Sequence, residues 1–513
     1  MGIYLSNTEY KALLSENRLL KSRIDSINRG AFVDKEVSKL KRDVSRLERM
    51  VSSRDKKIED LDGKLHRVNN KISELEKENQ ALKEENEKLK IQNSKDYTNS
   101  SLPSSSEIFI TKVKNSRVKS NRKPGGQFGH TGHHRKQYEA DECVYIDDDV
   151  DIVNNNDYVY TNKYLSRKLV DLSIDIKVKE FRSKIYKNVN TNKLYHALFP
   201  EGLDNEINYS SNIKAISYYL NNYCNVSIDK TKDFIYQITN HKLDLSKGFI
   251  SNLNSQFHLR SKQEIDELFS SLSKADILYT DNTNARVDGK SSFVYVTTDK
   301  DKALYSASKH KGHEGVALTP VSVSTGVIVH DHDKTFYSYG KNHQECWSHY
   351  LRYIQASIDY EKDITWSSKM KEFMQETIND IKKHPLNETQ IKKKKNQYDE
   401  IIRIGLKEYV DHPPNKYYMD GFNLLMRMRE YKDPTLYFLE HPQVDYTNNI
   451  SERLCRKVKR KIKAVTTFRS DESLSYYCDG LSIIETTRNR RENIFEKICD
   501  VFNSPKYKEE IIE

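Results

Sequence analysis

The sequence lacks an apolar run of about eighteen residues, the length that a membrane-spanning helix needs. Its first residues also lack the cationic and apolar segments of a secretory signal, so we expect a cytoplasmic protein that makes no membrane contact. The 6 cysteines are scattered, and none belongs to a CxxC pair. This spacing argues against a disulfide framework and against a standard zinc knuckle.

Apolar residues are also few. They make up 36% of the chain, whereas charged residues make up 31%, so a large part of the chain should be a solvated rod or tail. A length of 513 residues predicts about two to four folded units. The formal net charge of +10 favours a polyanionic partner, with nucleic acid first.

Residues 1–93 carry an apolar heptad repeat. Its apolar positions are Val37, Leu40, Val44, Leu47, Val51, Ile58, Leu61, Leu65, Val68, Ile72, Leu75, Leu82 and Leu89. This spacing predicts a coiled coil for oligomerisation, and Asn79 and Asn86 at core positions favour a parallel homodimer. The alternative is a single amphipathic helix that folds back on the protein.

Residues 94–140 form a predicted linker followed by a basic arm. Serine and asparagine dominate "NSKDYTNSSLPSSSE", which is typical of a linker. In "NRKPGGQFGHTGHHRK" the glycines let the backbone approach phosphates closely, so we predict a flexible DNA-contacting arm; a structural loop is the alternative. The predicted DNA-binding residues of this arm are Arg122, Lys123, His130, His133 and Arg135.

Two further regions separate the arm from the acidic motifs. Residues 141–207 alternate apolar and polar side chains, which predicts a small β-rich module. Residues 208–262 change to helical spacing with three short helices, compatible with a helix-turn-helix that binds DNA. A generic helical bundle has the same pattern.

Two aspartates follow apolar strands. Residues 275–312 predict three antiparallel strands, the first of which, "DILYT", ends at Asp281. A later strand, "TGVIVHD", ends at Asp331. Carboxylates at such strand ends can lie side by side at one edge of a sheet, although solvated strand-end aspartates are the commoner explanation.

A third acid stands alone in a cationic segment. Glu452 is the only carboxylate between Asp445 and Asp471. Three acids can hold two Mg²⁺ or Mn²⁺ ions for phosphodiester cleavage, and neighbouring cations can bind the DNA backbone. The candidate DNA-binding cations are Arg453, Arg456, Lys457, Lys459, Arg460, Lys463 and Arg469.

Taken together, these motifs resemble those of insertion sequence 66 family transposases. The matching stretches are "NSSLPSSSE", "RKPGGQFGHTGHHR", "YTDNTNARVDGK", "GVIVHDHDKTFY", "CWSHYLR", "NNISERLCRKVKRK" and "TTFRSDESLSYYCDGLSIIETTRNRREN", in family order, and the resemblance covers about residues 99–500. The resemblance implies an α/β fold with an RNase H-like core over residues 270–470 and a DDE triad of Asp281, Asp331 and Glu452. Asp333 is the rival for the second acid.

The long interval between Asp331 and Glu452 predicts a helical insertion at about residues 360–440, and residues 471–513 are expected to be a helical tail. His349 and Arg352 lie one helical turn apart and could both face the acids or the DNA. Asn448 and Asn449 are candidates to cap the helix that carries Glu452. Cys346 and Trp347 are expected to pack.

The chain departs from the family pattern at the cysteines that could bind zinc. Members of the family often carry paired cysteines after the glycine-histidine motif, whereas here Cys143 is alone and the next cysteine is Cys224. A site made from His130, His133, His134 and Cys143 is not expected, because glycine-rich flanks give no rigid tetrahedron. Structural zinc is therefore not predicted.

The predicted function is that of a bacterial, nucleoid-associated DNA transposase with two Mg²⁺ or Mn²⁺ ions. Its partners would be double-stranded DNA, at element ends and target, a second copy of the chain, and element-encoded helper proteins. One alternative is a catalytically inactive or decayed transposase-derived DNA-binding protein. A structural rod protein, without salt-dependent DNA affinity, is the other.

Overall fold

The computed structural model describes residues 7–27, 34–94, 129, 131, 137–146, 151, 154, 156–161, 163, 165–200, 202–414 and 418–505. The chain divides into two compact units, Met1–Lys95 and Asp96–Glu513. Within the described ranges, no helix has both the length and the apolar character to cross a membrane.

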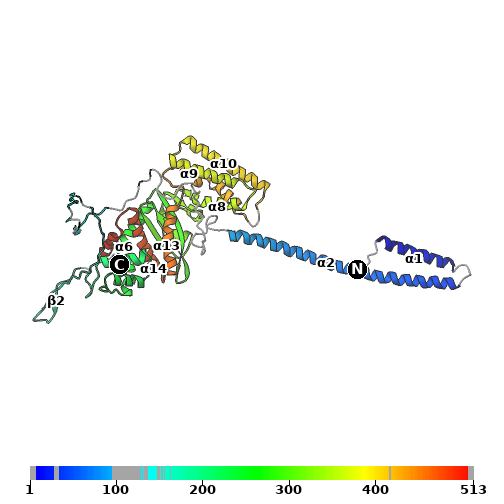
Figure 1. The fold of residues 1–513 in the computed structure, drawn as a ribbon, viewed down its shortest axis with the longest axis horizontal. Coiled ribbons are helices and arrows are strands. Elements are labelled where there is room, and N and C mark those ends of the chain that lie inside the picture. The colour runs from blue at the N-terminus through cyan, green and yellow to red at the C-terminus, as the bar shows by residue number, and fades with distance from the viewer. Residues whose placement is uncertain are drawn as a thin grey trace. The chain divides into compact units, whose positions relative to one another are not determined.

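The first unit is a helical hairpin. Its helices are α1 (Asn7–Ile27) and α2 (Asp34–Ser94), and α1 lies along the first part of α2 (Figure 1). The hydroxyl of Tyr10 donates to Asp55 over 2.7 Å, and Ile24 is buried in the hairpin. Helix α1 therefore covers only the first part of α2.

The rest of α2 exposes the predicted heptad positions. These side chains are between 36% and 58% exposed, and they are Leu61, Leu65, Val68, Ile72, Leu75, Leu82 and Leu89. An apolar stripe of this length is unfavourable in water. Within the first unit, none of the described residues covers this apolar face.

The predicted β-rich module is reduced in the structure. Among the described residues of 141–207, one small antiparallel sheet is present, formed by β1 (Ile185–Lys187) and β2 (Leu194–His196). Apolar side chains of the alternating pattern are exposed, and Val178, for example, is 90% exposed. Alternation predicts a strand only where one face becomes buried, and here no face is buried.

A five-stranded mixed sheet organises the second unit. Its strands are β3 (Ile277–Val287), β4 (Lys290–Thr298), β5 (Ala303–Ser308), β6 (Val327–His330) and β7 (Asn342–Glu345), in the order β5-β4-β3-β6-β7. The first three are antiparallel, as predicted, and β3, β6 and β7 are parallel. Asp288 and Gly289 turn β3 into β4 with positive φ angles of 48° and 72°, as a tight hairpin requires.

Helices before and after the strands pack together beside this sheet, and those at residues 247–273, 449–465 and 471–489 contact its strands. The helices of this group are α4 (Ser211–Tyr218) with the π-helical turn Tyr219–Tyr223, α5 (Ile228–Ile238), α6 (Lys247–Ser273), α13 (Asn449–Val465), α14 (Asp471–Asn489) and α15 (Ile494–Asn503) (Figure 1). Phe257 of α6 packs in one core with Ile328 of β6 and Ile484 of α14. Much of α6, the third helix of the predicted helix-turn-helix, is therefore part of the core.

The segment expected to be a C-terminal tail also contributes to the core. The hydroxyl oxygens of Thr486 and Ser482 on α14 accept hydrogen bonds from the N–H groups of Ala303 and Tyr305, at 3.0 and 2.9 Å. These bonds satisfy an edge strand that would otherwise expose its backbone. Helix α14 is therefore built into the sheet domain.

Along the sequence, further helices and short turns separate β5 from β6, β6 from β7, and β7 from α13. Short turns are α7 (His313–Val316) and the 3-10 segments Pro320–Val323, Lys334–Ser338 and Tyr437–Leu439, and the longer helices are α8 (Trp347–Tyr360), α9 (Trp366–Lys383), α10 (Glu388–Asp411), α11 (Asp420–Glu430) and α12 (Lys432–Leu436). Their core includes Trp366, Met370 and Tyr398, all almost fully buried. The described residues of the expected insertion, about 360–440, are thus mostly helical.

Candidate active site

Asp281 lies in the middle of β3, opposite Val296 of β4. The sequence placed it at the end of the strand, which is wrong, because β3 continues to Val287 with Thr283, Ala285 and Val287 buried. The buried threonine interrupts the apolar pattern without interrupting the strand. Burial and the negative charges of Asp331 and Glu452 raise the pKa of the Asp281 carboxyl to about 7.

Asp331 directly follows β6, as predicted. The parallel pairing of Tyr279 with Val329 brings the positions of Asp281 and Asp331, two residues further on, level with each other on neighbouring strands. Burial and the charge of Asp333 raise the pKa of the Asp331 carboxyl. Both aspartates are therefore in an environment that disfavours two negative charges.

The rival Asp333 has other partners. Its carboxylate accepts a hydrogen bond from the N–H of Thr335 at 3.0 Å and forms an ion pair with Lys311 at 3.3 Å. Its own N–H donates to Asp331 over 3.0 Å. This geometry makes Asp333 a cap for the following 3-10 turn, whereas Asp331 lies level with Asp281 on the neighbouring strand.

Glu452 lies in the first turn of α13, and Asn448 fixes the start of that helix. The Asn448 side chain donates to the carbonyl of Thr280 over 2.7 Å, and its backbone N–H donates to the sulfur of Cys346 over 3.1 Å. Asn448 occupies the predicted N-cap position, but its side chain forms no cap bond; it instead connects α13 to β3, one residue before Asp281. Asn449 accepts a hydrogen bond from Ser348 at 3.2 Å.

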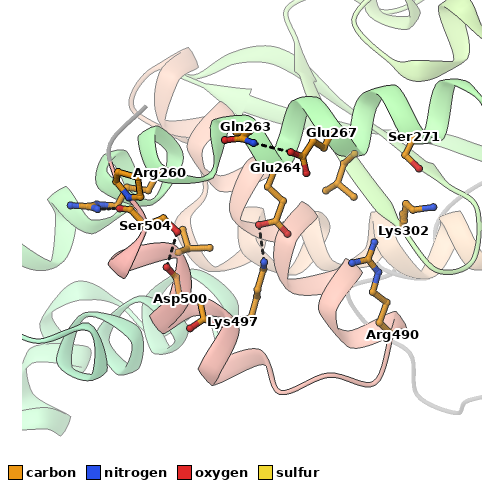
Figure 2. A pocket seen from close by; sticks show the side chains of 13 residues that line it. Arg260, Gln263, Glu264, Glu267, Ser271, Lys302, Arg490, Lys497, Asp500 and Ser504 are labelled. Atoms are coloured by element: carbon orange, nitrogen blue, oxygen red, sulfur yellow. Dashed lines mark hydrogen bonds and ion pairs between the residues drawn. The ribbon is translucent and has the colours of Figure 1, made fainter. Parts of the chain in front are cut away.

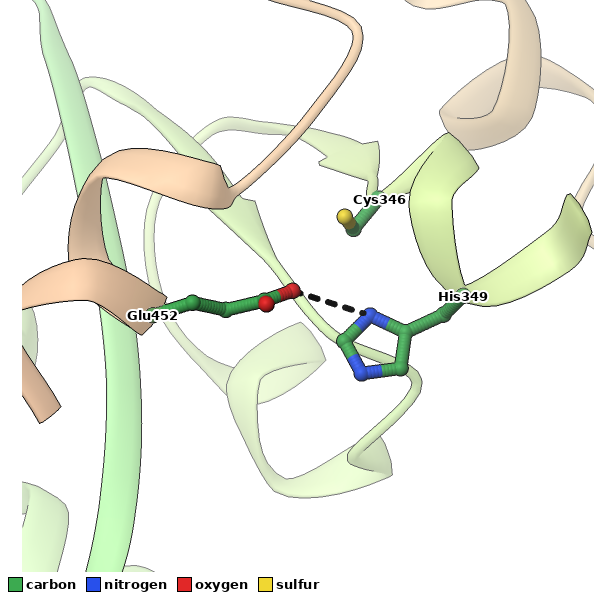
Figure 3. A group of neighbouring side chains, drawn as sticks. All are labelled: Cys346, His349 and Glu452. Carbon is green, nitrogen blue, oxygen red and sulfur yellow. Dashed lines mark ion pairs between the residues drawn. The ribbon is translucent and has the colours of Figure 1, made fainter. Parts of the chain in front are cut away.

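The Glu452 carboxylate faces three basic side chains. Nδ1 of His349 lies 3.7 Å and Nη2 of Arg352 4.0 Å from Oε1, while Arg456 lies 3.7 Å from Oε2. Burial and the charge of Arg352 lower the pKa of His349 to about 3, so the imidazole is neutral. Oε1 of Glu452 and Nδ1 of His349 are buried and have no hydrogen-bond partner among the described residues (Figure 3).

The cations after Glu452 divide between two faces of α13. Arg453, Arg456, Arg460 and Lys463 are exposed at helical spacing on one face, and Arg469 is exposed in the loop beyond the helix. Lys457 instead contacts the buried carboxylate of Glu485 at 2.5 Å, and the charge of the half-buried Lys459 lowers the pKa of Asp281. Lys457 is therefore a partly buried ion-pair partner, whereas the cations of the other face are open to solvent.

A buried polar cluster behind the site was not anticipated. Glu345, at the end of β7, is fully buried and accepts hydrogen bonds from Arg427 and Tyr350. Nε2 of His332 lies 4.0 Å from the same carboxylate. Glu345 directly precedes the "CWSH" motif, and this position could have marked it as a candidate site residue. Nothing in the sequence marks Arg427, 82 residues away, as its partner.

Cys455 was also missed. It lies one turn after Glu452 on the buried face of α13, and burial together with the charge of Asp281 raises the pKa of its thiol. Its spacing from Glu452 was visible in the sequence, but its contact with Asp281 depends on the packing of α13 against β3.

The structure does not describe every predicted site residue. Arg122, Lys123, His130, His133 and Arg135 lie outside the described residues, as does His134. Cys143 is described and exposed.

A separate cavity of about 600 Å³ is lined by α6 and α15, by Lys302 before β5 and by Arg490 directly after α14, and by none of the three acids (Figure 2). Lys497 pairs with Glu264 there at 2.9 Å, so this cavity has mixed charge.

A comparison with known protein families gives one match. Residues 231–475 match the sequence model described as Transposase IS66 family. The matched region runs from α5 into α14 and contains Asp281, Asp331 and Glu452. Among curated proteins, none matches the chain.

Proposed function

The chain belongs to the Transposase IS66 family, and we propose that it cleaves the ends of an insertion sequence and joins them to target DNA. Asp281, Asp331 and Glu452 would form the catalytic centre. The main observation in support of this proposal is the raised pKa of Asp281, which is caused by burial and by the charges of the other two acids. Three elements distant in sequence thus bring negative charge to one place.

The donor set fits Mg²⁺ or Mn²⁺. The three acids offer carboxylate oxygens, which these ions prefer, and the ions would relieve the repulsion that raises the pKa of Asp281. When bound, two such ions would act as Lewis acids on the phosphodiester and on the attacking water or 3′-hydroxyl. This chemistry needs no nucleophilic side chain from the protein.

The chain would position both the acids and the DNA. Asp281 and Asp331 are held by neighbouring parallel strands, and Asn448 ties the helix of Glu452 to the strand of Asp281. We infer an RNase H-like core from the sheet, in which three antiparallel strands are followed by two parallel ones with acids at β3 and after β6. The exposed cations of α13 would neutralise phosphates beside these acids.

We also propose that the active protein is a homo-oligomer, first a dimer, joined through α2. The exposed heptad stripe of α2 supports this assignment. Two copies would allow one assembly to hold both ends of an element. Helper proteins remain candidate partners for end recognition.

End cleavage in Mg²⁺ tests the proposal. Asp281→Asn, Asp331→Asn and Glu452→Gln should each lower the cleavage rate by at least about a thousandfold, because each removes an ionised ligand. Asp333→Asn is the matched control: asparagine also caps a helix, so the rate should stay within about threefold of wild type. The release of free 3′-hydroxyl ends is the readout.

Equal cleavage by wild type and Asp281→Asn would contradict the catalytic assignment. A protein that binds the ends equally in Mg²⁺ and in EDTA, and never yields free 3′-hydroxyls, would instead be a transposase-derived DNA-binding protein.

A further inference from the structure

Cys346 and His349 form a compact group with Glu452. This group differs from the three acids because it contains a sulfur and an imidazole. The sulfur of Cys346, a ring nitrogen of His349 and a carboxylate oxygen of Glu452 all lie within 4.8 Å of one another (Figure 3). Cys346 precedes α8 and His349 lies in its first turn, whereas Glu452 belongs to α13. The group therefore joins two elements that are separated by the whole helical insertion.

The spacing suits one small cation. Bond lengths of about 2.0–2.3 Å to zinc place tetrahedral ligand atoms roughly 3.3–3.8 Å apart. Nδ1 of His349 and Oε1 of Glu452 are already 3.7 Å apart. A small rotation of each side chain would complete the geometry with three protein ligands and one open position.

The two facing atoms also lack a hydrogen-bond partner among the described residues. Nδ1 of His349 and Oε1 of Glu452 are both buried without a hydrogen bond among the described residues. Buried polar atoms without a partner are costly, and a bound cation would satisfy both at once. Two cations of the chain also face Glu452: Arg456 lies near Oε2, and Arg352 is 4.0 Å from Oε1, too far for a hydrogen bond.

We propose that Cys346, His349 and Glu452 form a mononuclear site for zinc or a similar thiolate-binding divalent cation. A thiolate and an imidazole select such ions over Mg²⁺, which prefers oxygen ligands. The site shares only Glu452 with the magnesium centre. The role of the zinc site in the magnesium centre, which rests on the proposed function, is to fix the orientation of the Glu452 carboxylate.

Cobalt binding to the full-length, metal-free protein tests the site directly. Co²⁺ replaces zinc in such sites and gives a near-ultraviolet charge-transfer band when a thiolate binds it. Wild type should bind one equivalent with this band, zinc should remove the band at equal stoichiometry, and excess Mg²⁺ should leave it unchanged. The absence of the band in wild type would overturn the proposal without any variant.

Variants then identify the ligands. Cys346→Ser should abolish the band, and His349→Ala should weaken cobalt binding by at least about a hundredfold, since loss of even an outer-shell partner costs about 10–100-fold. Cys478→Ser, which alters a buried thiol on α14, is the matched control and should retain the band. A band that survives in Cys346→Ser would exclude this site, and circular dichroism confirms that each variant is folded.

Failure of this proposal can be distinguished from failure of the transposase mechanism. Asp281→Asn should lose DNA cleavage and keep the cobalt band, because Asp281 is not a ligand of the proposed zinc site. Loss of the band in Asp281→Asn would show that the two centres are not separate and would overturn the proposal. Cleavage by wild type with no thiolate band would leave the mechanism intact and remove only the zinc site.

Discussion

At the scale of single residues, the protein places carboxylates where their charges repel. The pKa of Asp281 is raised to about 7 by burial, Asp331 and Glu452, while the nearby Asp333 has its pKa lowered, against the effect of burial, by Thr335 and Lys311. The same residue type thus behaves in opposite ways at two positions of one domain. A proton or a divalent cation can relieve the repulsion around Asp281. Asp333 needs neither, because Thr335 and Lys311 already stabilise its negative charge.

This difference predicts how stability depends on pH. A folded-state pKa above the unfolded value of about 3.9 means that the folded protein binds this proton more tightly, so its stabilising effect is present at low pH and is lost as the pH rises through about 7. In EDTA, the free energy of unfolding of wild type relative to Asp281→Asn should fall by roughly 1–3 kcal/mol between about pH 5 and pH 8.

Urea unfolding at the two pH values provides the measurement. Asp333→Asn is the control, because a lowered pKa changes stability only below the unfolded value and so outside this window. A wild type and an Asp281→Asn variant with the same pH dependence would show that Asp281 is not held among like charges.

At the scale of elements, α13 has two roles on two faces. Its buried face carries Glu452, Cys455 and Lys457 toward the sheet and α14, and its outer face carries exposed cations. Lys457 and Glu485 form a largely buried ion pair beside the ring of Tyr223, over which Arg488 also lies. A basic segment therefore contributes to the stability of the core as well as to the surface charge.

Removing one partner of this pair should be costly. Lys457→Met should lower the free energy of unfolding by about 3 kcal/mol, because the buried Glu485 carboxylate would lose its closest cation; Arg488 nearby keeps the loss at the lower end of the usual range. Chemical denaturation measures this loss, and Lys457→Met combined with Glu485→Leu should recover most of it. Arg460→Met, on the exposed face, should change stability by no more than about 0.5 kcal/mol.

The outer face of α13 should set part of the salt dependence of DNA binding. Replacing Arg460 and Lys463 together by alanine should weaken binding to all sequences and reduce the slope of log K against log salt by about one for each phosphate that is no longer neutralised. Arg403→Ala, on the exposed surface of α10, is the control. Fluorescence anisotropy over a salt series gives the slope, and an unchanged slope in the double variant would remove this face from the DNA interface.

At the scale of the whole molecule, the chain joins a helical hairpin to a sheet domain with a helical insertion. In the first unit, α1 covers only the beginning of α2, and the heptad positions beyond remain exposed. Such a stripe of leucine, isoleucine and valine predicts self-association through α2. The two asparagines at core positions favour a parallel pair in one register.

Sedimentation of the full chain tests this association. Wild type should sediment as a dimer or larger oligomer, and Leu65→Lys combined with Leu75→Lys should shift it to monomer, because two charges would enter the apolar seam. Leu19→Lys, at an exposed position of α1, is the control and should not change the mass. A monomeric wild type at micromolar concentration would contradict the proposed dimer.

The sequence alone determined the long helix, the antiparallel strands and the strand before Asp331, because each depends on local periodicity of apolar residues. It also marked Glu452, since a single acid among cations is visible without coordinates. It overestimated strand content in residues 141–207, because alternation does not show whether a face will be buried.

Only the tertiary structure decided which groups meet. The bond from Thr335 to Asp333, the link from Asn448 to Thr280, the pair of Lys457 with Glu485 and the approach of Cys346 and His349 to Glu452 all depend on how the chain packs. Periodicity records which face of an element is apolar, but the contacts between faces depend on how several elements pack together. For that reason the acids could be named from the sequence, whereas the shifted pKa values of Asp281 and Asp331 and the partners of Glu452 required the fold.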